Sequence, residues 1–105
     1  MYKFVALYKP PADAAEFDAH FFGEHMPLIA KVPGLVKIDA FRPRGSSRGP
    51  AEHYLIAALY FDDEAAFKAA MGSPEMKAAG ENLMTFASNL VATESGTLID
   101  PLTGK

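Results

Sequence analysis

An apolar run in the second half of the chain constrains the fold more than any other feature. From Leu55 to Phe61 every residue is apolar or aromatic, and Phe4 to Tyr8 behaves in the same way. Successive side chains point to opposite faces of a β-strand, so strands of this kind need cover on both faces. The chain has 105 residues, half of them apolar. We therefore expect residues 1–105 to form a single domain around this sheet.

Strand and helix signals occur in the order strand–helix–strand, twice. We expect strands at 2–9, 35–42, 53–61 and 90–99, helices at 14–31 and 63–87 with a break at Gly72, and a polar tail at 100–105. This order predicts an α+β protein, a ferredoxin-like βαββαβ sandwich with four antiparallel strands and the helices on one face.

Short polar residues mark the expected helix starts. Asp13 is placed as an N-cap with Glu16 three residues later, and Ser73 precedes Pro74 in the same way. Pro27 has no backbone N–H and falls inside the first expected helix, so the helix should kink or rewind near residues 24–26. On a regular helical wheel, Phe17, Phe21 and Leu28 lie within about 40° of one another and predict the buried stripe.

Two helices can cover only one face of a four-stranded sheet. The second apolar face predicts a homodimer in which two copies pack sheet to sheet. The alternative is that the central strands expose a few apolar side chains, as many proteins do.

Composition excludes several classes of function. Ten Lys and Arg against 13 Asp and Glu give a net charge of −3, which argues against nucleic acid as a partner. There is no cysteine, so thiolate catalysis and Cys-based metal sites are excluded. No apolar run approaches the ~20 residues that span a bilayer, and no signal peptide is evident, so we expect a cytoplasmic protein without a membrane partner.

The candidate chemistry centres on His25. His20 and His25 are five residues apart, about 140° on a regular helix, which does not suit a metal pair, and we expect no metal. At the edge of the core, desolvation would keep His25 neutral and usable as a general base or an orienting hydrogen-bond donor. Alternatively, His25 pins the irregular turn by bonding a carbonyl that Pro27 leaves free.

Tyrosines supply the candidate partners for such a base. Tyr8, Tyr54 and Tyr60 all lie in expected strands, and one of them could share a cavity with His25 as an acid–base partner. The substrate-binding candidates are Phe17, Phe21, His20 and Leu28. The loop with Arg42, Arg44 and Arg48 could receive an anion, although a solvated hairpin loop is the simpler interpretation. Gly45 to Gly49 lacks the spacing and the lysine of a phosphate-binding loop.

One stretch resembles the EthD family of the dimeric α/β-barrel superfamily. That family's pattern has two aromatic residues four apart, then His-x-Pro-Leu and Pro-Gly-Leu. The residues that match it here are Phe17, Phe21, His25, Pro27, Leu28, Pro33, Gly34 and Leu35. Phe21 stands where many relatives have Trp or Tyr, and the likeness extends over nearly the whole chain.

The resemblance implies a ferredoxin-like protomer, a sheet-to-sheet dimer and a cavity between helices and sheet. Relatives are linked to the catabolism of small organic compounds, so an aromatic or polyketide-like substrate is implied, with His25 at the cavity. The family is often labelled reductase, but no nicotinamide or flavin motif is present, and we expect no cofactor. A cofactor-free cyclase, isomerase or oxygenase activity is therefore the first hypothesis. A non-catalytic binder of a small apolar metabolite is the second, and a haem-dependent monooxygenase is the third.

Overall fold

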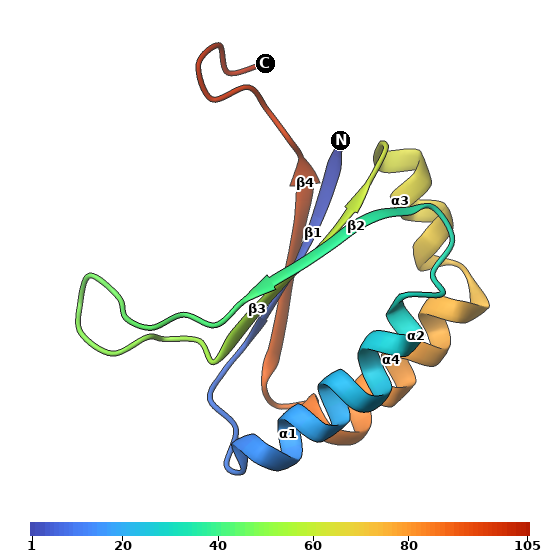
Figure 1. The fold of residues 1–105 in the computed structure, drawn as a ribbon. Helices are drawn as coiled ribbons and strands as arrows, with labels where there is room; N and C mark the ends of the chain where they lie inside the picture. The colour runs from blue at the N-terminus through green and yellow to red at the C-terminus, as the bar shows by residue number, and fades with distance from the viewer.

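The four strands form one antiparallel sheet in the order β2-β3-β1-β4, in a computed structural model that describes residues 1–105. The strands are β1 (Tyr2–Tyr8), β2 (Leu35–Phe41), β3 (Leu55–Phe61) and β4 (Val91–Thr97). The helices are α1 (Ala14–His20), the π-helix η1 (Phe21–His25), α2 (Met26–Ile29), α3 (Glu64–Met71) and α4 (Pro74–Ala87). All of them lie on one side of the sheet (Figure 1), which confirms the expected ferredoxin-like α+β fold.

Three side chains cap helix N-termini. Asp13 accepts a hydrogen bond from the Glu16 N–H at 3.0 Å, and Ser73 accepts one from the Met76 N–H at 3.1 Å, as the sequence predicts. Asp63 does the same for α3 and accepts from the Ala66 N–H at 2.8 Å. These bonds satisfy donors that have no partner inside the helix, so they fix where each helix begins.

The first helical segment rewinds before Pro27, in a turn that begins at Phe21 and includes the residues at which the sequence predicts the irregularity. Residues 21–25 form a π turn, closed by a hydrogen bond from the Met26 N–H to the Phe21 carbonyl. Pro27 cannot donate to the carbonyl of Gly23, so the regular α-helical ladder is interrupted at this point. The segment continues as α2 and ends before Gly34, whose φ of 78° is the left-handed conformation that glycine adopts readily.

The π turn keeps every fourth side chain on one buried face. Phe17, Phe21, His25 and Ile29 are each 4% exposed or less. In an uninterrupted α-helix, three steps of four residues would rotate the last of them by about 120° away from the first. The wider turn absorbs this drift. The predicted buried stripe is therefore wrong at its last residue. Ile29 is buried in place of Leu28, which is only half-buried.

The core between helices and sheet consists of two clusters. One surrounds Phe61 and includes Tyr2, Ile29 and Leu59, while the other surrounds Tyr8 and Phe21. Phe4 and Met26 pack against both clusters. The boundary between them therefore runs across the middle of the sheet.

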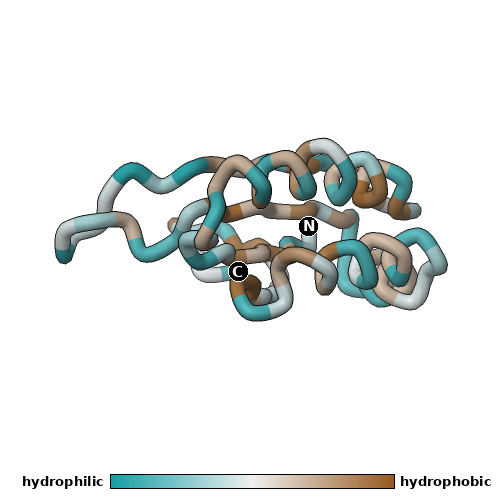
Figure 2. Tube along the Cα trace, turned by 90° about the horizontal axis from the view of Figure 1, so that it is seen from below, coloured by the Kyte–Doolittle hydropathy of each residue, from teal (hydrophilic) through white to brown (hydrophobic).

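The loop between β2 and β3 and the segment after β4 both project from the layers (Figure 1). The loop is coloured as hydrophilic or neutral along most of its length (Figure 2). No helix is long and apolar enough to span a membrane.

The capping geometry gives a stability prediction. Replacing Asp63 by Ala should lower the free energy of unfolding by about 1 kcal/mol, because the Ala66 N–H loses its acceptor. Denaturant unfolding followed by circular dichroism measures the change. Asp62→Ala is the matched control, since the Asp62 side chain caps nothing, and its unfolding midpoint should stay close to that of the wild type. Equal losses in the two variants would contradict the capping role.

Candidate functional site

A cavity of about 240 Å³ lies between the sheet and the helices, where the two core clusters meet. Ten of its 13 lining residues are hydrophobic. The lining consists of Phe4, Ala6, Tyr8, His25, Met26, Ile29, Ala57, Leu59, Met71, Met76, Gly80, Leu83 and Thr93. A dry apolar cavity of about 150 Å³ is enough to hold benzene. This cavity is therefore large enough for a one-ring or short-chain organic molecule.

Small residues create the cavity. Ala6 and Ala57 are neighbours in the pairing of β1 with β3 and occupy the middle of the helix-facing sheet surface. Gly80 faces them from α4, and a Cβ added there would meet no atom within 4 Å. Larger side chains at these three positions would fill the space, whereas the three methionines of the lining are flexible and adapt to irregular shapes.

His25 brings the imidazole to the cavity wall. The side chain is 4% exposed, and its ring lies against Phe21 and Phe86, with centroid distances of 5.6 and 6.2 Å. Burial lowers the pKa of His25, while the Ala79 carbonyl and the Asn82 side chain oppose the shift. Since the usual pKa is already below 7, the imidazole is neutral at neutral pH. Nδ1 has no hydrogen-bond partner, so the ring does not pin a carbonyl of the irregular turn through this atom.

Tyr8 lines the same cavity from β1 and is 1% exposed. Burial alone raises the pKa of its hydroxyl, so the phenol stays protonated at any physiological pH. A neutral imidazole and a neutral phenol thus share a wall of apolar side chains. In the resting state the pair carries no charge, His25 can accept a proton and Tyr8 can donate a hydrogen bond.

The other two candidate tyrosines lie elsewhere. Tyr54 donates to both carboxylate oxygens of Asp18 at 3.0 Å, and the Arg42 guanidinium lies 4.4 Å from its ring centroid. Tyr60 points to the opposite face of the sheet, where its hydroxyl donates to Asp39 at 3.1 Å. The structure therefore brings Tyr8, and neither of these two, together with His25 at the cavity.

None of the four substrate-binding candidates lines the cavity. Phe17 and Phe21 are buried in the core beside it, with their rings stacked at 5.6 Å, and Leu28 is half-buried on α2. His20 lies in a larger surface groove of about 420 Å³ between the start of α1 and the end of α4. That groove is open, four of its 11 lining residues are hydrophobic, and His25 and Tyr8 do not line it.

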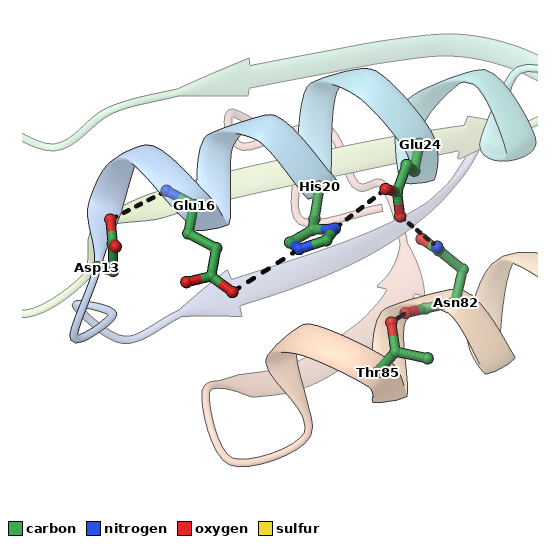
Figure 3. A network of polar contacts seen from close by, with 6 residues as sticks. All are labelled: Asp13, Glu16, His20, Glu24, Asn82 and Thr85. Atoms are coloured by element: carbon green, nitrogen blue, oxygen red, sulfur yellow. Dashed lines mark hydrogen bonds and ion pairs between the residues drawn. The ribbon is translucent and has the colours of Figure 1, made fainter.

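A polar network runs along the outside of the first helical segment and crosses to α4 (Figure 3). His20 lies between Glu16 and Glu24, with its Nδ1 3.1 Å from Glu24 Oε2. Asn82 donates to Glu24 Oε1 at 3.1 Å. The bonds from His20 and Asn82 lower the pKa of the Glu24 carboxyl. The network joins the two helical segments beside the cavity.

Asn82 and most of the cavity lining are not evident from the sequence. Asn82 belongs to no recognisable motif, and its contacts depend on how α4 packs against η1. One sequence pattern could have indicated part of the cavity lining. Phe4, Ala6 and Tyr8 share one parity of β1, so the tyrosine of that parity and the small residue beside it could have been placed facing the helices.

No group of three or more side chains is arranged to hold a metal ion. The polar side chains that line the cavity are those of His25, Tyr8 and Thr93.

Comparison with known proteins shows close relatives. The family model described as EthD domain matches residues 9–89. An ethyl tert-butyl ether D (EthD) family protein from Bacillus halodurans C-125 is 38% identical, with a TM-score of 0.89 over 94% of this chain and 99% of that one. An uncharacterized 11.0 kDa protein in the thcB-thcC intergenic region of Rhodococcus erythropolis is 34% identical over 84% of this chain and 85% of its own length.

More distant structures share the fold alone. SnoaB from Streptomyces nogalater, a cofactor-independent oxygenase, is 20% identical, with a TM-score of 0.70 over 97% of this chain and 96% of its own. A dimeric ferredoxin-like protein of unknown function from Jannaschia sp. CCS1 is 18% identical, with a TM-score of 0.70 over 92% and 98% of the two chains.

The buried imidazole predicts a pH dependence of stability. The folded state holds His25 at a lowered pKa, so below the ordinary value near 6.5 the unfolded state binds a proton that the folded state does not. The free energy of unfolding should therefore fall as the pH is lowered from 7.5 to 5, and it should fall less in His25→Gln.

Urea unfolding at half-unit pH intervals measures this difference. The Glu24 carboxyl, with its pKa lowered, titrates below this range and affects both proteins equally. Parallel pH profiles for the wild type and the variant would contradict the burial of a neutral His25.

Proposed function

The chain belongs to the EthD family, and on that premise we propose that it acts on a small apolar organic compound held in the cavity beside His25. The observation that carries the proposal is a neutral imidazole, 4% exposed, on the wall of a cavity with ten hydrophobic lining residues out of 13. A site of this kind buries an apolar ligand and offers it a few polar groups that set its orientation.

The proposed chemistry is proton transfer without a cofactor. His25 acts as the general base or as the hydrogen-bonding group that orients the ligand, because its pKa lies below neutral pH. Tyr8 stays protonated and donates a hydrogen bond to an oxygen of the ligand on which negative charge develops. Such a pair suits an isomerisation, a cyclisation or the deprotonation that precedes attack by oxygen.

The fold gives a precedent for this chemistry. SnoaB shares the fold and is a cofactor-independent oxygenase. That likeness supports, for this chain, an activity that needs no cofactor. The EthD-family protein from Bacillus halodurans, at 38% identity, has the same fold with a TM-score of 0.89.

We also propose that two copies pair through the uncovered face of the sheet. The side chains on that face form three rows across the strands. One end row is apolar throughout and consists of Ala92, Leu7, Ile56 and Phe41. Phe41 is 58% exposed in the single chain. The apolar row would be shielded from water by a second copy.

The other rows carry charges of both signs. Lys3 and Lys37 flank the Tyr60 ring at 5.3 and 5.2 Å, and Asp39 and Glu94 lie in the middle row. A two-fold axis can bring opposite charges of such a face together, so the pattern suits self-association. The ferredoxin-like neighbour from Jannaschia is described as dimeric, which supports the same arrangement.

Filling the cavity tests the proposed function. Gly80→Leu should lower the affinity for a cavity ligand at least tenfold, because the new side chain extends into the space that the ligand needs. A panel of one-ring aromatic and alicyclic compounds, followed by ligand-observed NMR, measures binding. Ala78→Leu is the matched control on the exposed side of α4 and should bind as the wild type does.

The same panel distinguishes an enzyme from a binder. Products are followed by mass spectrometry in the wild type and in His25→Gln. Turnover that is lost in the variant while binding persists supports catalysis by His25. Binding without turnover in the wild type supports a non-catalytic metabolite carrier instead. If no panel compound binds, or if Gly80→Leu binds as the wild type does, the cavity is not the site.

A charge on the uncovered sheet face tests the pairing. Ile56→Glu should convert a dimer of twice 11.3 kDa into a monomer, because an unpaired carboxylate would be buried between the sheets. Light scattering after gel filtration measures the mass. Phe22→Glu introduces the same charge at a 49% exposed position in the helical layer and should stay dimeric. A monomeric wild type would refute the pairing.

A further inference from the structure

Two buried polar atoms beside the cavity lack hydrogen-bond partners. They are Nδ1 of His25 and Oδ1 of Asn82. Asn82 donates through its Nδ2 to Glu24, the residue directly before His25, at 3.1 Å. Phe86, one turn further along α4, packs against the His25 ring. The two unpartnered atoms therefore lie at the same contact between η1 and α4, and leaving both unpaired would cost free energy.

The Glu24 carboxylate fixes which way the Asn82 amide points. A carboxylate only accepts hydrogen bonds, so it takes the NH₂ group of Asn82 and turns Oδ1 the other way. Glu24 is itself held by His20 Nδ1 at 3.1 Å (Figure 3). The surface network thus presents a hydrogen-bond acceptor, Oδ1, toward the interior.

We propose that Asn82 is a positioning residue that holds His25 in the Nδ1–H tautomer and leaves Nε2 as the hydrogen-bond acceptor in the cavity. The Asn82 side chain neighbours the His25 ring, and both its Oδ1 and the ring Nδ1 are buried without other partners. Oδ1 can pair with Nδ1 only when Nδ1 carries the single N–H of the neutral imidazole. Nε2 then keeps its lone pair. The Ala79 carbonyl also neighbours the ring, but α4 already uses its carbonyls in the helical ladder.

This tautomer indicates which class of ligand the cavity binds. The inference about the ligand rests on the proposed function. A lone pair at Nε2 selects molecules with an acidic hydrogen, such as a phenol, an enol or a C–H next to a carbonyl. Tyr8 offers the complementary donor from β1. Enolisable or phenolic one-ring compounds therefore suit the cavity better than hydrocarbons of the same shape.

The tautomer can be measured without any ligand. In protein labelled with ¹⁵N-histidine, long-range ¹H–¹⁵N correlation spectra distinguish protonated from unprotonated ring nitrogens, and His25→Gln identifies the His25 signals. We expect a protonated Nδ1 and an unprotonated Nε2 in the wild type. In Asn82→Leu the signals should shift toward the other tautomer. A wild type protonated at Nε2, or an Asn82→Leu spectrum that matches the wild type, would overturn the proposal.

A second variant covers the case in which Asn82→Leu does not fold. Asn82→Asp keeps an acceptor at the same place, so the Nδ1–H tautomer should persist and the pKa of His25 should rise toward or above its ordinary value. The titratable groups near the ring are Tyr8 on β1, His20 at the end of α1 and Glu24 on η1. Of these, Glu24 loses the hydrogen bond that Asn82 donates, so its own pKa should rise in this variant and is followed alongside that of His25. Asn89→Leu is the matched control and should leave both readouts unaltered. An unmoved pKa in Asn82→Asp would overturn the proposal.

A pair of probes tests the ligand class separately. Phenol and toluene have nearly the same shape, and only phenol donates a hydrogen bond. The ratio of their affinities should favour phenol roughly 3- to 10-fold more in the wild type than in Asn82→Leu, the value of one hydrogen bond. An unchanged ratio overturns the ligand class. If the tautomer is as expected but neither probe binds, the proposed function fails and the positioning role of Asn82 stands.

Discussion

The hydrogen bond from the Met26 N–H to the Phe21 carbonyl is the interaction on which the site depends. It closes the π turn ahead of Pro27, where the regular ladder cannot continue. Because that turn is wider than an α-helical one, Phe17, His25 and Ile29 face the core together. A straight helix would carry Ile29 about 120° away from Phe17, and the buried stripe that supports the cavity would be lost.

The cavity exists because small residues occupy the boundary between the two core clusters. Ala6 and Ala57 on the sheet and Gly80 on α4 line the cavity from opposite sides. None of them has a side chain long enough to fill the space between them. Close packing elsewhere holds the space open, since Tyr8, Phe21 and Phe61 are 1% exposed or less. Burial then keeps the His25 and Tyr8 side chains neutral, so the same geometry that makes the cavity also sets its acid–base character.

The two sheet faces divide the roles of the molecule. Side chains of one parity, such as Phe4 and Tyr8, line the core and the cavity, and those of the other parity, such as Leu7 and Ile56, form the proposed pairing surface. A helical layer joined by the network of His20, Glu24 and Asn82 closes the cavity on its outer side. Adjacent residues of one strand thus belong to the cavity and to the proposed pairing surface, because a strand alternates its side chains between two faces.

The sequence by itself determined the fold class, the helix starts at Asp13 and Ser73 and the place of His25 at the edge of the core. These features rest on local signals: strand composition, short-range caps and a proline inside a helical run. Tertiary structure alone decided that Ile29 replaces Leu28 in the buried stripe, and that Tyr8 shares the cavity while Tyr54 and Tyr60 do not. It also placed Asn82 beside Glu24 and His25. These placements depend on the extra width of one helical turn and on packing between segments some 60 residues apart in sequence, and neither leaves a periodic pattern in the chain.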